Sequence, residues 1–318
     1  MQSGTLPQVL HTYQNHLLDS TRWEGYSPRD DDIIVASSYK SGTTWTQSIV
    51  RELIVHSLGQ HNANVSVPLP DDRSSLWVDD SRVTDKKYEQ LEAQTHRRSL
   101  KTHLPLDGLP FYPQVKYIVL GRDARDVFMS LWNHYSGCTE QFYQVLNNAP
   151  NLIGPPLPYC PEDIHLFWQN WTSRGWFDWE QEGYPFWGNM RHTQTWWNYR
   201  HLDNIQFFHY ADMLADPKAE IKRMATFLGI EVSDEALTAI IQETSLSTMQ
   251  RRNQAVRNTY IYFKEGAETF FFKGMNGRWR GVLSEDELAM YETTKSQVLT
   301  PDCARWLEQG RVALSCLS

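Results

Sequence analysis

The residues with the clearest chemical potential form a short turn between an apolar run and a helical pattern. Ile33–Ala36 are typical of a buried strand, and the stretch from Thr43 to about Leu58 has the pattern of an amphipathic helix. Lys40 and Gly42 lie between them, where the free N–H groups and the positive end of the helix dipole converge. Further donors are the hydroxyls of Ser41, Thr43 and Thr44. The chemistry that this turn predicts is anion binding.

This turn is not a Walker loop. A Walker loop places Lys directly after the second of two glycines, whereas Lys40 precedes Gly42, the single glycine of the turn. The alternative is that Thr43 or Thr44 merely caps the helix and that Lys40 is a surface charge. The turn alone leaves both interpretations open, so the other motifs must decide.

A basic segment follows a second strand-like run, Ser99–Thr102. Lys101 and His103 are two residues apart, so their side chains project to the same side of an extended chain. An imidazole can accept a proton near neutral pH, which makes His103 a candidate general base. The alternative is a structural histidine.

A cationic strand end follows the buried run Val115–Leu120. Arg122 offers a planar fork that suits a phosphate group, and Ser130 adds a neutral donor two turns into the next helix. The alternative is a surface Arg–Asp network, which fits Arg125 and Asp126 better than Arg122, because Arg122 leaves a buried strand. Near the C-terminus, a Lys273-Gly274 pair combines charge with a backbone that a ligand can approach closely.

The elements that must position these motifs alternate between strands and helices. A further strand is predicted at Ile205–Tyr210, and further helices at Asp123 to about Tyr135 (with Asp123 as N-cap), Glu162–Trp176, Thr193–Arg200, Pro217–Leu228 (ended by Gly229), Ser233–Gln242 and Ser284–Gln297. This alternation predicts an α/β fold with a central parallel sheet covered by helices on both faces. The strand ends of such sheets bind ligands. We expect residues 1–318 to form a single domain.

Three segments could shape a binding site. Asn147–Pro161 is rich in proline and Arg251–Gly281 is long and punctuated by glycine, so both are candidates for lids, the alternative being surface insertions. The aromatic cluster Phe167–Tyr199 could line a pocket for an apolar or aromatic molecule, although core packing is the expected role of most of its rings.

Composition excludes several classes of protein. A formal charge of −8 argues against nonspecific nucleic-acid binding. No apolar run approaches the ~18 residues of a membrane span, and the N-terminus has no secretory pattern. The four cysteines have no paired spacing, which indicates free thiols in a reducing, cytoplasmic compartment.

Taken together and in order, these motifs resemble the cytosolic-type sulfotransferase family, which uses 3′-phosphoadenosine 5′-phosphosulfate (PAPS) as donor and needs no metal. The order is a Lys-Ser-Gly-Thr-Thr-Trp loop, Lys-Thr-His, an Arg followed eight residues later by Ser, Tyr210 after a strand, and a late Lys-Gly-x-x-Gly-x-Trp element, over residues 33 to 281. Three stretches are similar to bacterial members, including glycolipid sulfotransferases: Ile34–Trp45, Lys101–Gly108 and Phe208–Asp212.

The resemblance implies a role for each matching position. In the catalytic group, His103 would deprotonate a hydroxyl of a small, apolar or aromatic acceptor, while Lys40 and Lys101 steady charge. In the donor-binding group, the 5′-phosphosulfate would be held by Lys40, Ser41, Gly42, Thr43, Thr44 and Trp45, the 3′-phosphate by Arg122, Ser130, Lys273 and Gly274, and the nucleoside by Tyr210 and the Thr244–Met249 segment, including Thr244, Leu246 and Met249. The implied fold is the P-loop-like sulfotransferase fold, with the nucleotide-binding loop after the first strand.

The sequence departs from the family pattern at four places. Ser38-Tyr39 stands where the family has Tyr-Pro, Leu246 stands where a Phe stacks on adenine, and Phe272 replaces a 3′-phosphate cation for which Arg257, Lys264 or Arg278 could substitute. The dimerisation motif of animal members is not recognisable around Arg280–Glu287, so the sequence leaves open whether the chain forms a homodimer.

Two rival functions remain. A nucleotide kinase would use the same class of loop, but it requires Walker spacing and a magnesium-holding Asp at a strand end. A catalytically silent member of the family would bind the nucleotide without transferring sulfate, and the departures at Phe272 and Leu246 favour it.

Overall fold

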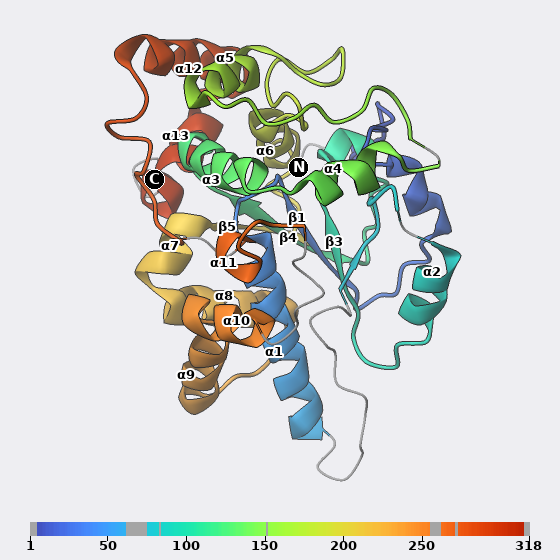
Figure 1. Cartoon of the computed structure of the whole chain (residues 1–318). Coiled ribbons are helices and arrows are strands. Elements are labelled where there is room, and N and C mark those ends of the chain that lie inside the picture. The colour runs from blue at the N-terminus through green and yellow to red at the C-terminus, as the bar shows by residue number, and fades with distance from the viewer. Residues whose placement is uncertain are drawn as a thin grey trace.

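A five-stranded, fully parallel sheet forms the centre of the molecule (Figure 1). The structure is a computed structural model that describes residues 5–61, 75–82, 84–150, 152–254, 262–270 and 273–314. The strands are β1 (Ile33–Ser37), β2 (Leu76–Trp77), β3 (Ser99–Thr102), β4 (Lys116–Gly121) and β5 (Ile205–His209), and their order across the sheet is β2-β3-β1-β4-β5. The predicted central parallel sheet is therefore confirmed.

The central strand β1 is apolar because both of its faces are covered. All five of its residues are buried, and it pairs with β3 on one side and β4 on the other, in registers that place Ile33 opposite Ser99 and Lys116. Ile34 and Ala36 belong to one hydrophobic core and Ile33 and Val35 to a second core. A strand buried on both faces reads as a continuous apolar run, which is why this element is recognisable in the sequence.

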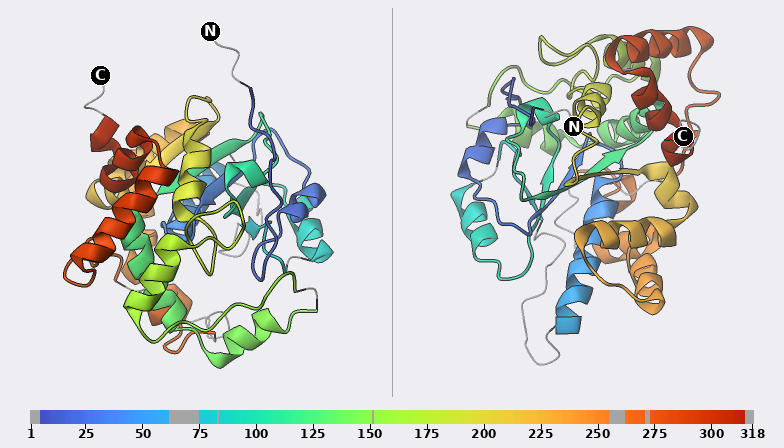
Figure 2. Two further views of the ribbon diagram at one scale, coloured as in Figure 1. Left: turned by 90° about the horizontal axis from the view of Figure 1, so that it is seen from above. Right: turned by 180° about the vertical axis from the view of Figure 1, so that it is seen from behind.

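Helices cover both faces of the sheet. On one face lie α3 (Ala124–Ser136), α5 (Ile164–Ser173), α6 (Asn189–Trp197), α12 (Glu285–Val298) and α13 (Pro301–Gln309), and on the other α1 (Thr43–His61), α7 (Tyr210–Ala215), α8 (Pro217–Leu228) and α9 (Asp234–Glu243). Figure 2 shows the same division from behind, with α12 and α13 in red above the sheet and α1 in blue below it. The remaining elements are α2 (Asp85–Glu92), α4 (Glu140–Asn147), α10 (Leu246–Gln254), α11 (Ala267–Phe270) and the 3₁₀ turns η1 (Ser20–Gly25), η2 (Leu106–Gly108) and η3 (Gly310–Leu314).

Local signals fixed most helix ends. The Asp123 carboxylate accepts the Arg125 N–H at the start of α3, and Gly229 ends α8 in the left-handed conformation with φ 69°. The predicted boundaries were wrong by the most at two helices: α5 spans Ile164–Ser173 instead of Glu162–Trp176, and α6 spans Asn189–Trp197 instead of Thr193–Arg200. Tertiary contacts extend α6, because the Glu182 carboxylate accepts the first N–H groups of this helix.

The two predicted irregular segments differ. Asn147–Pro161 lies after α4 and has no described helix or strand, apart from Asn147 at the end of α4, as its prolines predict. Arg251–Gly281 is partly helical, since it contains the end of α10 and all of α11. No described helix is both long and apolar enough to cross a membrane.

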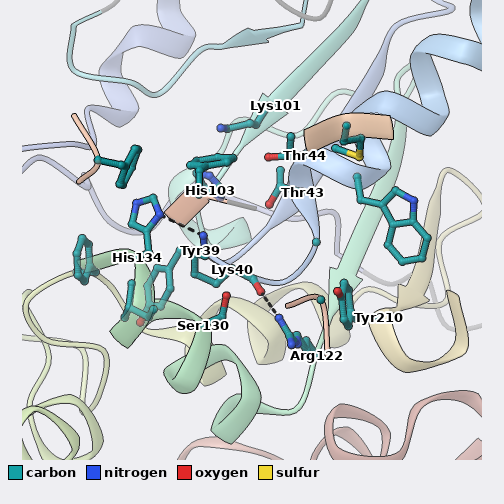
Figure 3. A pocket seen from close by; sticks show the side chains of 18 of the residues that line it. Tyr39, Lys40, Thr43, Thr44, Lys101, His103, Arg122, Ser130, His134 and Tyr210 are labelled. Atoms are coloured by element: carbon teal, nitrogen blue, oxygen red, sulfur yellow. Dashed lines mark hydrogen bonds between the residues drawn. The ribbon is translucent and has the colours of Figure 1, made fainter. Parts of the chain in front are cut away.

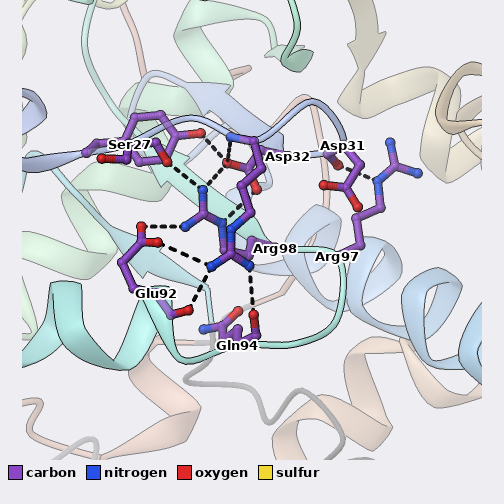
Figure 4. A network of polar contacts seen from close by, with 9 residues as sticks. Ser27, Asp31, Asp32, Glu92, Gln94, Arg97 and Arg98 are labelled. Carbon is purple, nitrogen blue, oxygen red and sulfur yellow. Dashed lines mark hydrogen bonds and ion pairs between the residues drawn. The ribbon is translucent and has the colours of Figure 1, made fainter.

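A buried polar network fixes the amino ends of β1 and β3, opposite the ligand-binding edge (Figure 4). The Arg98 side chain is fully buried; its Nε donates to Asp32 Oδ1 at 2.8 Å and its Nη1 to Glu92 Oε1 at 2.6 Å. Arg98 and Asp32 directly precede the two strands, so this ion pair holds the strands in register. Breaking one partner of such a buried pair costs about 3–5 kcal/mol, because the other charge stays buried.

Candidate active site

The strand order brings four of the predicted motifs to one edge of the sheet. Strands β3, β1, β4 and β5 are consecutive, and their carboxyl ends lead into His103, the turn at Lys40, Arg122 and Tyr210. The side chains surround a cavity of about 430 Å³ (Figure 3). Carboxyl ends of parallel strands meet at the same edge, which is why residues from four separate segments converge there.

Nearly all predicted site residues line this cavity. They are Lys40, Gly42, Thr43, Thr44, Trp45, Lys101, His103, Arg122, Ser130, Tyr210, Thr244, Leu246, Met249, Lys273 and Gly274. Ser41 is the exception: its hydroxyl turns away and lies 3.0 Å from the Ser38 hydroxyl. Its side chain supports the shape of the turn.

The turn at Lys40 requires unusual backbone angles. Lys40 has φ 59° and Gly42 has φ 103°, both in the region that favours glycine. A Cβ on Gly42 would lie 2.8 Å from Cδ2 of Tyr210, so a larger residue cannot enter without moving that ring. The Ser37 and Thr43 hydroxyls are 2.6 Å apart and tie the strand to the start of α1.

Lys40 projects into the cavity between polar and aromatic neighbours. Its Nζ is 3.2 Å from Nδ1 of His134 and 5.0 Å from the centre of the Phe270 ring. Burial, reinforced by the positive charge of Arg122, lowers the pKa of Lys40 to about 7. An anion that binds beside Lys40 raises this pKa again and so favours the charged form of the side chain.

Arg122 joins three segments at the edge of the cavity. Its guanidinium donates to the Lys40 carbonyl at 3.1 Å, to the Met275 carbonyl at 3.0 Å and to Oδ1 of Asn276 at 3.1 Å. Its Cζ lies 4.2 Å from the centre of the Tyr210 ring. Burial lowers the pKa of Arg122, but a guanidinium remains charged at neutral pH. This side chain is a fixed positive charge that also ties the first turn to the C-terminal glycine segment.

His103 has the tautomer that a general base needs. Its Nδ1 is 2.7 Å from the Ser37 carbonyl oxygen, which can only accept, so Nδ1 carries the proton and Nε2 keeps its lone pair. Burial, followed by the charge of Lys101, holds the pKa of His103 well below its ordinary value. The imidazole is therefore neutral at pH 7. The backbone N–H of His103 donates to Oδ2 of Asp79 at 3.0 Å and fixes the segment.

Lys101 lies on the same side of the chain as His103, as the spacing predicts. Both side chains line the cavity, and the Lys101 ammonium lies 4.3 Å from the centre of the Trp77 ring. Burial lowers the pKa of Lys101 to about 8. A cation beside a neutral imidazole suits a site in which negative charge develops.

The residues that the resemblance assigns to the nucleoside lie close to one another. The Trp45 and Tyr210 ring centres are 5.8 Å apart at 77°. A Cβ on Gly274 would lie 3.2 Å from Cδ2 of Leu246 and 3.6 Å from the Tyr210 hydroxyl. Thr244 is almost fully buried and its hydroxyl donates to the Ile240 carbonyl at 2.7 Å, so it contributes shape more than hydrogen bonds.

Three aromatic or imidazole residues of the cavity wall lie outside every motif, cluster or lid that the sequence singled out, namely Trp77, His134 and Phe142. Phe186 and Trp187 belong to the predicted aromatic cluster, and Tyr262, Phe263 and Phe270 belong to the predicted lid segment Arg251–Gly281. His134 could have been found, because it follows Ser130 by four residues and therefore shares its helix face. Trp168, Trp171 and Trp196 fill the hydrophobic core, the role expected of most rings in the aromatic cluster.

Tyr39 explains one departure from the family pattern in structural terms. Its ring lines the cavity, and its hydroxyl accepts a hydrogen bond from Nε1 of Trp171 at 2.7 Å. Trp171 is fully buried on α5. The tyrosine at this position therefore anchors the turn to the core and adds to the aromatic wall.

The described charged side chains that line the cavity are all positive. Six cationic side chains line it, namely Lys40, Arg82, Lys101, Arg122, Lys273 and Arg278, and no carboxylate does so among the residues that the structure describes. Arg278 also donates to the Met129 carbonyl at 2.7 Å, whereas Lys264 donates to the Ser136 carbonyl and is not part of the lining. Phe272 and Arg257 lie outside the described residues. A protein with a net charge of −8 thus concentrates positive charge at one site.

The described ranges contain no group of three or more His, Cys, Asp or Glu side chains that could hold a metal ion. The independence from metal implied by the family resemblance stays a prediction.

Comparison with known proteins shows the family to which the chain is similar. Residues 30–299 match the family described as "Sulfotransferase domain". A glycolipid sulfotransferase of Mycobacterium bovis is 32% identical over 317 residues, which cover 94% of each chain. Sulfotransferase 1B1 of the dog is 29% identical over 290 residues, which cover 87% of each chain.

Solved structures share the fold. Mouse sulfotransferase SULT7A1, crystallised with PAP, superposes with a TM-score of 0.65 at 21% identity, covering 91% of this chain and 92% of that one. Retinol dehydratase, in a complex with androsterone and the inactive cofactor PAP, gives 0.64 at 23% identity, covering 88% of this chain and 84% of that one. The family match over most of the sequence, together with the 32% identity, shows that this chain belongs to the sulfotransferase family.

Proposed function

We propose that the protein transfers a sulfuryl group from PAPS to a hydroxyl of a small, apolar or aromatic acceptor. The observation that carries the proposal is the pairing of a neutral imidazole with a cationic anion-binding turn: His103 keeps the Nε2 lone pair in the cavity that Lys40 enters. The mouse sulfotransferase and the retinol dehydratase that share the fold were crystallised with PAP, the desulfated form of this donor.

The residues of the cavity fit such a donor. A molecule with a 5′-phosphosulfate and a 3′-phosphate needs several cations and no carboxylate, which is what the described lining provides. Gly42 and Gly274 leave room for close backbone approach, since a Cβ at either position would press on Tyr210 or Leu246. We infer that Lys40 and the turn up to Thr44 hold the phosphosulfate, while Arg122, Ser130 and Lys273 hold the 3′-phosphate.

Arg278 is our candidate for the cation that Phe272 replaces. It lines the cavity, and burial, followed by the positive charge of Arg122, lowers its pKa. Lys264 is held elsewhere by the Ser136 carbonyl.

The proposed chemistry follows from these positions. PAPS supplies an activated sulfuryl group, and its transfer is an in-line displacement that, like phosphoryl transfer, depends mainly on positioning and charge stabilisation. His103 takes the proton of the acceptor hydroxyl at Nε2, help that is worth about 10²–10⁴-fold in rate. Lys40 stabilises the charge that grows on the leaving-group oxygen, and Lys101 stabilises charge near the base.

The acceptor would occupy the aromatic side of the cavity. Tyr39, Phe186 and Trp187 form an apolar wall near His103, whose ring lies 5.6 Å from that of Trp187. Such a wall favours an apolar or aromatic body with one reacting hydroxyl. The 32% identical mycobacterial relative is named for a glycolipid acceptor, so a hydroxylated lipid belongs in any search.

The test is transfer of radiolabelled sulfate from PAPS to a panel of phenols, aliphatic alcohols and glycolipids, with and without EDTA. Labelled product that is unaffected by EDTA supports the proposal and argues against a magnesium-dependent kinase. Binding of PAP with no transfer to any acceptor class would instead identify the catalytically silent alternative. A single domain and a cytoplasmic location stay predictions.

A further inference from the structure

His134 contacts the lysine at the centre of the proposed reaction. It lies on α3 one turn after Ser130, and both side chains line the active-site cavity. Nδ1 of His134 is 3.2 Å from Nζ of Lys40, although the two residues are 94 positions apart. Figure 3 shows the Lys40 side chain reaching toward His134 while its carbonyl faces Arg122.

In its charged form, Lys40 is the donor of this hydrogen bond. An ammonium group has three donors and no acceptor, so a histidine nitrogen beside it must accept. Burial, followed by the charges of Lys40 and Lys101, holds the pKa of His134 well below its ordinary value, which keeps the ring neutral at pH 7. Nδ1 is then the acceptor and Nε2 carries the ring proton.

The surroundings of Lys40 make this acceptor important. The charged or titratable groups that face it are Arg122 after β4, Lys101 and His103 at the end of β3, His134 in the last turn of α3, and Cys138 just after that helix. Two of these, the cations Arg122 and Lys101, disfavour the ammonium form, and the thiol of Cys138 has a pKa raised by burial to about 12. No carboxylate lines this part of the described cavity. The neutral imidazole is therefore a polar partner of the ammonium in a site without a counter-ion.

Aromatic packing holds the imidazole in place. The His134 ring lies 4.7 Å from the Phe263 ring and 5.7 Å from the Phe270 ring, both centre to centre. Lys40 approaches the same Phe270 ring. A ring fixed on two sides presents Nδ1 in one direction, which is what orienting a flexible lysine requires.

We propose that His134 is a positioning residue for Lys40: Nδ1 accepts one ammonium hydrogen and leaves the other two for the donor. The proposal rests on the function proposed above, in which Lys40 stabilises the leaving group. The hydrogen bond favours the charged form of Lys40 and aims it into the cavity. Without it, a larger fraction of the enzyme has a neutral lysine at neutral pH.

Three variants separate this role from packing. His134→Phe keeps a flat ring but removes the acceptor, whereas His134→Asn restores an acceptor oxygen close to the position of Nδ1. His165→Phe is the matched control, because His165 is half exposed and pairs with Glu287 away from the cavity. Should His134→Phe fail to fold, His134→Leu provides the same comparison.

The first measurement is the pH dependence of kcat for sulfate transfer. A hydrogen bond to a charged group is strong enough that its loss lowers the apparent pKa of the alkaline limb by about one pH unit, a tenfold change in the protonation equilibrium. We expect this shift in His134→Phe, its reversal in His134→Asn and no shift in His165→Phe. An unchanged limb in His134→Phe overturns the proposal.

The second measurement needs no turnover. Calorimetry of PAP binding at pH 7, in two buffers of different ionisation enthalpy, counts the protons taken up. His134→Phe is expected to take up more protons than the wild type, because more of its Lys40 is neutral before binding, while His134→Asn resembles the wild type. Equal uptake in all variants overturns the role of His134. Absence of any sulfate transfer by the wild type overturns the proposed function and leaves this binding measurement interpretable.

Discussion

Nδ1 of His103 lies 2.7 Å from the backbone carbonyl oxygen of Ser37, the last residue of β1. This contact joins the ends of two adjacent strands and decides which nitrogen of the ring carries the proton. The nitrogen that remains free is Nε2, and the side chain lines the same cavity as Lys40. The backbone of the central strand thus prepares His103 to act as a base.

Replacing His103 should stop turnover and leave donor binding nearly intact. His103→Ala removes the proton acceptor, so we expect kcat to fall by about 10²–10⁴-fold, while the Kd for PAP changes by no more than about threefold. Labelled sulfate transfer and calorimetry with PAP measure the two effects. Substantial turnover in this variant would refute the assignment of the base.

Arg122→Ala should weaken binding of PAP. Loss of a charged hydrogen-bonding partner of a phosphate costs about 1.5–3 kcal/mol, which corresponds to a Kd about 10- to 100-fold higher. Arg125→Ala is the matched control, because Arg125 belongs to the same helix start but pairs with Asp123 and does not line the cavity. Melting temperatures of both variants show whether lost packing contributes. Equal affinity in the two variants contradicts the predicted phosphate contact.

Gly42→Ala tests the shape of the turn. The new Cβ would lie 2.8 Å from the Tyr210 ring in a residue with φ 103°, so both contact and backbone strain oppose it. We expect PAP affinity to drop by at least tenfold. Gly154→Ala is the control for strain alone, since Gly154 has φ 75° and its Cβ would contact nothing within 4 Å. PAP affinity should be unchanged in that variant, and a normal affinity in Gly42→Ala would show that the turn tolerates the side chain.

Binding of PAP should weaken as the pH rises above 7. Burial lowers the pKa of Lys40 to about 7, so above that pH Lys40 is mostly neutral in the free protein and must take up a proton to hold an anion. The Kd is expected to rise by up to about tenfold for each pH unit between 7.5 and 9, and Lys101, with a pKa lowered to about 8, acts in the same direction. Titrations followed by tryptophan fluorescence measure this slope. Lys40→Met should bind weakly with a shallower slope, and a pH-independent Kd of the wild type excludes the mechanism.

Glu180 should make the protein less stable as the pH rises from 5 to 8. Burial raises the pKa of its carboxyl to about 8; Oε1 accepts the Gly188 N–H at 2.8 Å, while Oε2 has no partner among the described residues. The folded protein therefore binds a proton that the unfolded chain releases near pH 4.5, and the free energy of unfolding falls as the pH rises through this window.

Urea unfolding at pH 5, 6.5 and 8 checks this expectation. In Glu180→Gln the loss of stability between pH 5 and 8 should shrink by an amount on the order of 3 kcal/mol. Glu162→Gln, at an exposed position, serves as the control and should follow the wild type. Parallel curves for Glu180→Gln and the wild type would show that this carboxyl ionises normally.

The sequence determined the parts of the site that depend on neighbouring residues. The apolar run of β1, the Lys40–Thr44 turn and the start of α1 are contiguous, so local rules predict a strand, a tight turn and a helix N-terminus there. The same reasoning places Arg122 after β4 and His103 after β3. A chain assembled from such units is confined to an α/β fold with its ligand site at the strand ends.

Tertiary structure alone decided how these units meet. The order β3-β1-β4-β5 brings His103, Lys40, Arg122 and Tyr210 together, and it turns the Ser41 hydroxyl away although its position in the motif predicted a ligand contact. The His134–Lys40 contact joins residues 94 positions apart. Such contacts depend on how helices pack on the sheet, and packing is set by the volumes and shapes of distant side chains, which local patterns of hydrophobicity and charge do not encode.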